Sequence, residues 1–270
     1  MSSPAQLWQY RTLISNLTRR DLKAKYRKSL LGQLWSLLSP AATLGTYTLV
    51  FGVIFETHAP IAGNGTTESF ALYLFAALII WNFFSAGVSA SIDGLQGAGP
   101  LLNKIYFPPE GPVLAVVFGV IVQLGFELTV LILIMGIVGN LSWTFFLFPV
   151  VLLVPIVAFA LGCGLIASIL NIFYRDVRYL IGILLQLAFY MTPIVYKIEQ
   201  IPEKFHGFPA RRVVNLNPLA RFVDASRELF YLHTVPSFSS IAYMWIVSLA
   251  MFGIGWRFFT KRAAQAVEEL

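Results

Sequence analysis

The chain has 270 residues, of which 57% are hydrophobic and only 12% are charged, whereas an ordinary soluble domain has about 25% charged residues. With a mean hydropathy of +0.74, it has too little polar surface to enclose a water-soluble globule, and an all-α membrane protein is predicted. The lone Cys163 excludes an internal disulfide, and three scattered histidines offer little for a metal site: His58, His206 and His233. The net charge of +6 is best explained by membrane topology, with no nucleic-acid partner.

The uncharged intervals predict six membrane-spanning helices, because a helix needs about 20 apolar residues to cross the hydrocarbon core. The interval from Glu127 to Arg175 is too long for one helix, and the turn-forming residues 139–142 divide it in two. The predicted spans are 36–56, 70–92, 113–138, 144–173, 179–196 and 236–257. Residues 1–270 are expected to form a single transmembrane domain.

The lysines and arginines predict that both ends of the chain face the cytoplasm. With six spans, thirteen of these residues lie on the side of the two termini and six on the other side, all between Lys197 and Arg227. Short cytoplasmic loops carry the excess of such residues. The first 20 residues lack the apolar core and small-residue cleavage site of a removable signal peptide.

The first 34 residues predict a cytoplasmic amphipathic helix in the membrane interface. One apolar stripe lies within residues 7–17 and a second, rotated stripe within 22–30. Thr18 followed by Asp21 fits a helix-start box, so the helix is expected to restart there. Its basic residues would lie beside anionic lipid. The helix is either a topology anchor alone or a lateral element that frames a docking surface.

Two short segments on the predicted cytoplasmic side could form that docking surface. Between spans two and three, glycine and proline residues isolate an amphipathic stretch, Leu101–Phe107. Between spans four and five lies the charged cluster Arg175–Asp176–Val177–Arg178. The alternative is that both are ordinary loops that obey the charge rule.

Residues 197–235 are too polar to cross the membrane and too regularly patterned for disorder. Apolar residues recur at helical spacing after Asn217–Pro218, which predicts a re-entrant or interfacial helix pair on the outer side. Pro193 would break the hydrogen-bond ladder of the fifth span near that surface and allow a change of direction.

The sequence contains none of the patterns expected of an enzyme. It has no P-loop, no Ser-His-Asp set and no paired carboxylates at a membrane edge. No catalytic, cofactor-binding or metal-binding residue is therefore assigned. Glu127 is the one ionisable residue deep in a predicted span, a position that often marks an ion route. Gln123 and Glu127 share a helix face, and we favour a hydrogen bond across a helix contact instead.

Aromatic and small polar residues share faces of three predicted spans. They are Tyr47, Phe51 and Phe55 in the first span, Trp81, Asn82 and Ser85 in the second, and Phe189, Tyr190 and Tyr196 in the fifth. Such stripes commonly serve packing or lipid contact. The functional alternative is a substrate channel that holds sugar rings by stacking, without charge selectivity.

Several motifs together resemble one family. They are residues 19–27 (RRDLKAKYR) followed by Leu31–Trp35 and Ser39–Pro40, then residues 104–108 (KIYFP), 174–177 (YRDV), Thr192–Ile194 and Asn217–Pro218. This combination is similar to the ABC-2 type permeases that export polysaccharides such as O-antigen, teichoic acid, capsule or galactan. The resemblance covers essentially the whole chain.

That resemblance implies a homodimer in the bacterial cytoplasmic membrane, each copy docked on a separate ATPase subunit that binds ATP and Mg. The coupling residues would be Leu101, Leu102, Lys104, Tyr106, Phe107, Tyr174, Arg175, Asp176 and Arg178. The 197–235 segment would be the outer gate, with Pro193, Asn217 and Pro218 as gate residues, and a lipid-linked glycan would be the substrate. One departure follows the Phe107–Pro108 pair: relatives commonly carry an arginine there, whereas this chain continues with Pro109–Glu110–Gly111–Pro112.

Three other functions remain open from the sequence. A drug or lipid exporter of the same family would share the topology. A membrane-embedded transferase would be active alone, and a stand-alone channel would conduct without nucleotide. Co-purification with an ATPase subunit would separate these alternatives.

Overall fold

The computed structural model describes residues 8–25, 29–102, 104, 107–196, 198, 201–203 and 210–270. In this part of the chain every regular element is a helix, apart from an isolated bridge between His58 and Ser69. The predicted all-α class is therefore confirmed. In chain order the elements are α2 (Arg11–Lys25), η1 (Gly32–Leu34), α3 (Trp35–Tyr47), η2 (Thr48–Ile54), α4 (Phe70–Gly97), α5 (Gly99–Leu102), α6 (Glu110–Ile137), η3 (Trp143–Leu147), η4 (Pro149–Leu153), α7 (Val154–Phe173), α8 (Val177–Met191), α9 (Ala210–Leu216), α10 (Pro218–Arg227), η6 (Glu228–Leu232) and α11 (Phe238–Glu268).

Among the described residues, five helical segments are long and apolar enough to cross a membrane. They are Gly32–Ile54, Phe70–Gly97, Glu110–Ile137, Trp143–Phe173 and Phe238–Glu268. The predicted break at 139–142 is a turn, where Gly139 has a φ of +70°. The predicted span 179–196 overlaps α8, which ends at Met191, has 15 residues and is shorter than a typical crossing. The count of six spans therefore stays a prediction.

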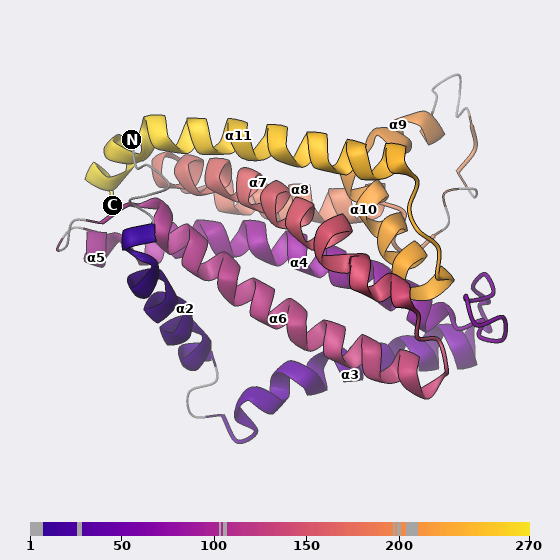
Figure 1. The fold of residues 1–270 in the computed structure, drawn as a ribbon. Helices are drawn as coiled ribbons and strands as arrows, with labels where there is room; N and C mark the ends of the chain where they lie inside the picture. The colour runs from indigo at the N-terminus through magenta and orange to yellow at the C-terminus, as the bar shows by residue number, and fades with distance from the viewer. Residues whose placement is uncertain are drawn as a thin grey trace.

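Helix α2 runs without interruption from Arg11 to Lys25, so the expected restart near Thr18 is wrong. Thr18 Oγ1 lies 3.0 Å from the carbonyl oxygen of Ile14 and 2.9 Å from that of Ala115 in α6. The hydroxyl thus joins two helices instead of capping one. Ile14 and Leu17 are buried on the same face, which holds α2 against α6 (Figure 1).

Helix α4 lies in the middle of the bundle, between α6 and α7 (Figure 1). Its first half is buried almost completely, as its continuous apolar run predicts. Small residues allow α7 and α11 to approach each other closely. A Cβ atom on Gly162 of α7 would lie 2.5 Å from the carbonyl oxygen of Met251, and one on Gly255 of α11 would overlap Gly162. Helices α7 and α11 therefore pack backbone against backbone.

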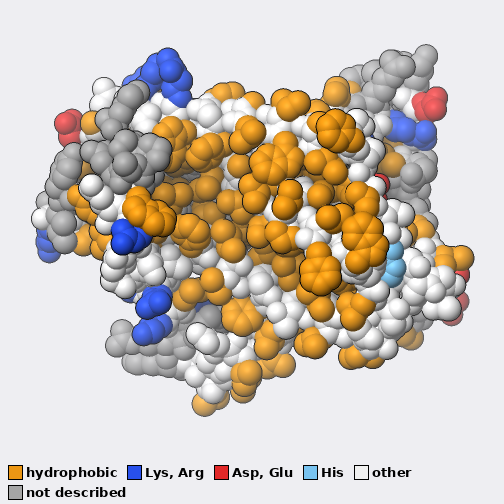
Figure 2. Space-filling model, in the orientation of Figure 1, with side chains coloured by type: hydrophobic (Ala, Val, Ile, Leu, Met, Phe, Trp, Pro, Cys, Tyr) orange, Lys and Arg blue, Asp and Glu red, His pale blue; other side chains and the backbone are white. Residues whose placement is uncertain are grey.

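The bundle has two distinct ends. The start of α2, the short α5 and the end of α11 lie together at the end we call the α5 end (Figure 1). The opposite end, called the α10 end, carries the 57–69 and 138–143 loops together with α9, α10 and η6. Figure 2 shows hydrophobic side chains across the middle of one face and most charged side chains toward the two ends, as expected for a protein surrounded by lipid.

Candidate docking, channel and gate sites

At the α5 end, the first predicted coupling segment begins within the single helical turn α5 (Gly99–Leu102). Leu102 and Phe107 are buried in one apolar cluster with Ile14 of α2 and Val113 of α6. Leu101 is half-buried, Lys104 is exposed, and Tyr106 lies outside the described residues. The apolar members of this segment therefore hold it against the bundle, and its cation faces solvent.

The start of α6 lies within the sequence departure at Pro109–Pro112, which includes Glu110. This residue is 2% exposed and occupies the first turn of α6. The exposed peptide N–H groups of a helix start favour a negative charge. The acidic residue thus suits the first turn of α6.

The second predicted coupling segment is one turn between α7 and α8. Tyr174, Arg175 and Asp176 are exposed, whereas Val177 is buried. The N–H of Val177 donates to the carbonyl oxygen of Tyr174 at 3.0 Å, which closes the turn. The Tyr174–Asp176 turn therefore presents one aromatic and two charged side chains to solvent.

Arg178, the next predicted coupling residue, is paired within the chain. Its Nη1 lies 3.0 Å from Asp93 Oδ1 and its Nη2 donates to Asp93 Oδ2 at 3.3 Å. Asn171 Oδ1 accepts the backbone N–H of Arg178 at 3.1 Å, and Asn171 Nδ2 donates to Gln96 Oε1 at 3.3 Å. These contacts join the α7–α8 junction to the last turns of α4, directly before α5.

The first set of predicted channel residues forms a ladder along α3 and η2. Ring centroids of Tyr47 and Phe51, and of Phe51 and Phe55, are 6.1 Å apart. Phe51 also contacts Phe70 at the start of α4, at 5.1 Å. Phe70 in turn contacts Tyr73, so the ladder extends into the α10 end of α4.

The second set lies between α4 and α8. Trp81 is buried and packs edge-on against Phe189, with centroids 5.5 Å apart. Asn82 Nδ2 donates to Glu127 Oε2 at 3.4 Å, which is the cross-helix hydrogen bond expected for Glu127. Ser85 Oγ donates to the carbonyl oxygen of Asn82 at 3.3 Å.

The remaining channel residues lie near the end of α8. Tyr190 is exposed. Tyr196 Oη donates to the carbonyl oxygen of Tyr190 at 2.8 Å. Tyr190 contacts Phe189 edge-on, and Phe189 in turn contacts the buried Trp81, so these rings run from an exposed surface into the core.

The three predicted gate residues converge at the α10 end. Helix α8 ends at Met191, and Thr192 Oγ1 accepts a hydrogen bond from Asn217 Nδ2 at 3.0 Å. Asn217 Oδ1 also accepts the N–H of Leu219 at 3.0 Å and so caps α10, whose first residue is Pro218. Pro193 follows Thr192 directly.

Arg227, which the sequence reasoning missed, holds this junction from within. It is 2% exposed, and its guanidinium donates to the carbonyl oxygens of Pro193, at 2.8 Å, and Ile194. It also lies 4.1 Å from the ring centroid of Tyr73 and 3.6 Å from Asp224. The helical pattern gave no signal for it, since Arg227 lies off the apolar stripe that Phe222, Ala225 and Leu229 form.

For Asn140, the sequence predicts only a turn. Its side chain is fully buried, donates to the carbonyl oxygen of Tyr231 at 3.1 Å and accepts the N–H of Asn64 at 3.1 Å. Nearby, Thr144 Oγ1 donates to the carbonyl oxygen of Leu229 at 2.7 Å. Side chains from the α6–α7 connection thus hold both η6 and the 57–69 loop.

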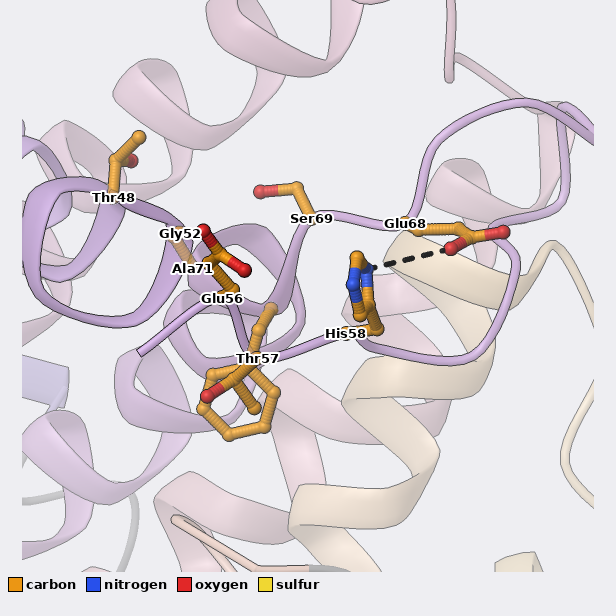
Figure 3. A pocket seen from close by; sticks show the side chains of 9 residues that line it. Thr48, Gly52, Glu56, Thr57, His58, Glu68, Ser69 and Ala71 are labelled. Atoms are coloured by element: carbon orange, nitrogen blue, oxygen red, sulfur yellow. Dashed lines mark ion pairs between the residues drawn. The ribbon is translucent and has the colours of Figure 1, made fainter. Parts of the chain in front are cut away.

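A recess of about 350 Å³ opens beside these loops (Figure 3). Its lining comprises Thr48, Gly52, Glu56, Thr57, His58, Glu68, Ser69, Phe70 and Ala71. His58 Nδ1 lies 3.6 Å from Glu68 Oε2. Among the described residues, no group of three or more His, Cys, Asp or Glu side chains is placed to hold a metal ion.

These features define a multi-pass helical membrane protein with an apolar belt between two polar ends. The chain belongs to the ABC-2 type transporter family, whose sequence model matches residues 12–231. It is 28% identical to the O-antigen export system permease protein RfbA of Myxococcus xanthus, over 98% of each chain. It is 27% identical to the protein of the same name from Klebsiella pneumoniae, over 92% of this chain and 91% of that one. It is 24% identical to the polysialic acid transport protein KpsM of Escherichia coli, over 92% of this chain and 93% of that one.

Proposed function

We propose that this chain is the permease subunit of an ABC transporter that exports a lipid-linked polysaccharide across the bacterial cytoplasmic membrane. The observation that carries the proposal lies at the α5 end. There the exposed Tyr174–Asp176 turn and α5 are both attached to the last turns of α4. A chain without a P-loop needs a partner to bind ATP and Mg. The similarity to O-antigen and polysialic acid permeases supports a glycan as substrate.

In the proposed topology, α8 is the fifth of six spans and both termini are cytoplasmic. The α5 end of each copy in the homodimer then faces one of two ATPase subunits. The α10 end faces outward, with residues 197–235 as re-entrant gate helices. The short apolar helix α8 has an exposed surface that includes Tyr190. A second copy of the chain or lipid is expected to cover this surface.

The proposed mechanism transmits force from the ATPases to the helices. ATP binding closes the partner subunits, and their movement displaces α5 and the Tyr174–Asp176 turn. A channel between the two copies then opens, and the aromatic ladder of Tyr47, Phe51 and Phe55 contacts successive sugars. Neutral aromatic rings stack on sugar rings without charge selectivity, so no single deep binding site retains the polymer.

The test is export and ATPase binding by the intact complex. Cells lacking this chain are expected to lose the glycan from their surface and to regain it with the wild-type chain. Arg175→Glu is expected to weaken co-purification of the ATPase about tenfold or more, because a reversed interfacial charge costs upward of about 1.4 kcal/mol.

Lys261→Glu is the matched control, since it makes the same charge change on exposed α11 at the same end. It is expected to leave ATPase binding within about twofold of wild type, as is usual for charges outside an interface. Surface glycan that is unchanged without this chain would contradict the proposal. Export of a small drug or a lipid instead of a glycan would favour the other branch of the family.

A further inference from the structure

The two predicted coupling arginines differ in their surroundings. Arg175 lies in the exposed Tyr174–Asp176 turn. Arg178, one helical turn further on, directs two guanidinium nitrogens at the two carboxylate oxygens of Asp93, at 3.0 and 3.3 Å. Two parallel contacts fix the orientation of a guanidinium as well as its distance. Arg178 is therefore committed to α4, whereas Arg175 faces solvent.

A second connection runs beside this pair. Asn171, which is 3% exposed, accepts the backbone N–H of Arg178 and donates to Gln96 Oε1. Its amide thus replaces the missing side-chain cap at the start of α8, where Asp176 makes no such bond. Together, the ion pair and the amide link the first turn of α8 to the last two turns of α4.

The position of α4 makes this link mechanically useful. Helix α4 ends at Gly97 and α5 begins at Gly99, and the N–H groups of Leu101 and Leu102 both donate to the carbonyl oxygen of Ala98 at 2.9 Å. The two coupling elements are therefore attached to one end of one buried helix. A displacement of either element is transmitted to the other through side-chain contacts instead of flexible loops.

We infer that Asp93 and Arg178 form a positioning pair that makes the two coupling elements move as one body, and that Arg178 is not itself an ATPase contact. The inference rests on the proposed function. With side chains 58% and 50% exposed, the pair contributes little to folding stability. Its loss should separate ATPase binding from the permease's control of ATP hydrolysis.

The experiment is a charge swap in the complex of permease and ATPase. Arg178→Glu and Asp93→Arg, each alone, are expected to retain the ATPase on co-purification. Each is expected to reduce the permease-dependent control of ATP hydrolysis, measured as the change in hydrolysis rate that the permease causes, by about tenfold, within the usual range of coupling between sites. The double variant Asp93→Arg/Arg178→Glu is expected to recover most of that control. Arg175→Glu, as the matched control, should lose ATPase binding and should not be rescued by Asp93→Arg.

Two results would overturn the pairing. One is a double variant no better than the single variants, and the other is loss of ATPase binding in Arg178→Glu equal to that in Arg175→Glu. Glycan export by the wild-type complex is measured separately. A wild type that exports no glycan while the swap still restores control of hydrolysis would refute the proposed substrate and leave the pairing intact.

Discussion

Helix α8 is held at each end by an arginine, and the two ends differ. At the α5 end, Arg178 binds an exposed carboxylate on α4. At the α10 end, buried Arg227 binds the carbonyl oxygens of Pro193 and Ile194, just beyond the last residue of α8. A solvated ion pair contributes little to folding stability, whereas a buried arginine that loses its acceptors pays a large desolvation penalty. The comparison indicates that the arginine at the α10 end stabilises the fold, whereas the one at the α5 end mainly sets the position of the coupling elements.

The largest expected effect is at Arg227. Arg227→Leu leaves two buried carbonyl oxygens without a donor and removes the ring contact with Tyr73, so the unfolding free energy should fall by about 2–5 kcal/mol. Arg178→Leu should cost only about 0–1 kcal/mol. Denaturation of both purified variants in the same detergent measures the difference. Equal losses would show that the two ends of α8 are held equally.

The next largest effect is the loss of stability expected from a substitution of Asn140 at the α10 end. Asn140→Ala removes the donor to Tyr231 and the acceptor for Asn64 in a fully buried position, which should cost about 1–3 kcal/mol. Ser142→Ala is the matched control, because Ser142 Oγ accepts only a 3.4 Å contact from Thr144 N–H within its own turn. Hydrogen exchange of residues 228–232 should rise in the first variant and stay unchanged in the second.

The sequence predicted the elements that depend on local pattern and missed those that depend on distant partners. Uncharged intervals predicted the long helices, the turn-forming residues predicted the 139–142 turn, and apolar spacing predicted a helix after Asn217–Pro218. Thr18 shows the opposite case, since its hydroxyl bonds to Ala115 in another helix. The same holds for the Asp93–Arg178 pair.

The candidate sites follow the same rule. Pro193, Asn217 and Pro218 were predicted as gate residues, and the structure brings them together. Arg227, which links that cluster to α4, was counted only as one of the outer cations. Its partners are backbone carbonyl oxygens, which leave no trace in a side-chain pattern.

The smallest expected effect concerns pH and Glu228 at the start of η6. Burial raises the pKa of Glu228, the negative charge of Asp224 raises it further, and Arg221 lowers it. A carboxyl group whose pKa is raised on folding stabilises the fold below its unfolded pKa, about 4.3, and loses that contribution as the pH rises through the folded pKa. Relative to Glu228→Gln, which cannot titrate, the wild type should therefore gain stability as the pH is lowered toward 4.3. Melting temperatures of the two proteins across that range measure the gain. Parallel curves would mean that Glu228 is solvated in the folded protein, and that the α10 end is less firmly buried than Arg227 indicates.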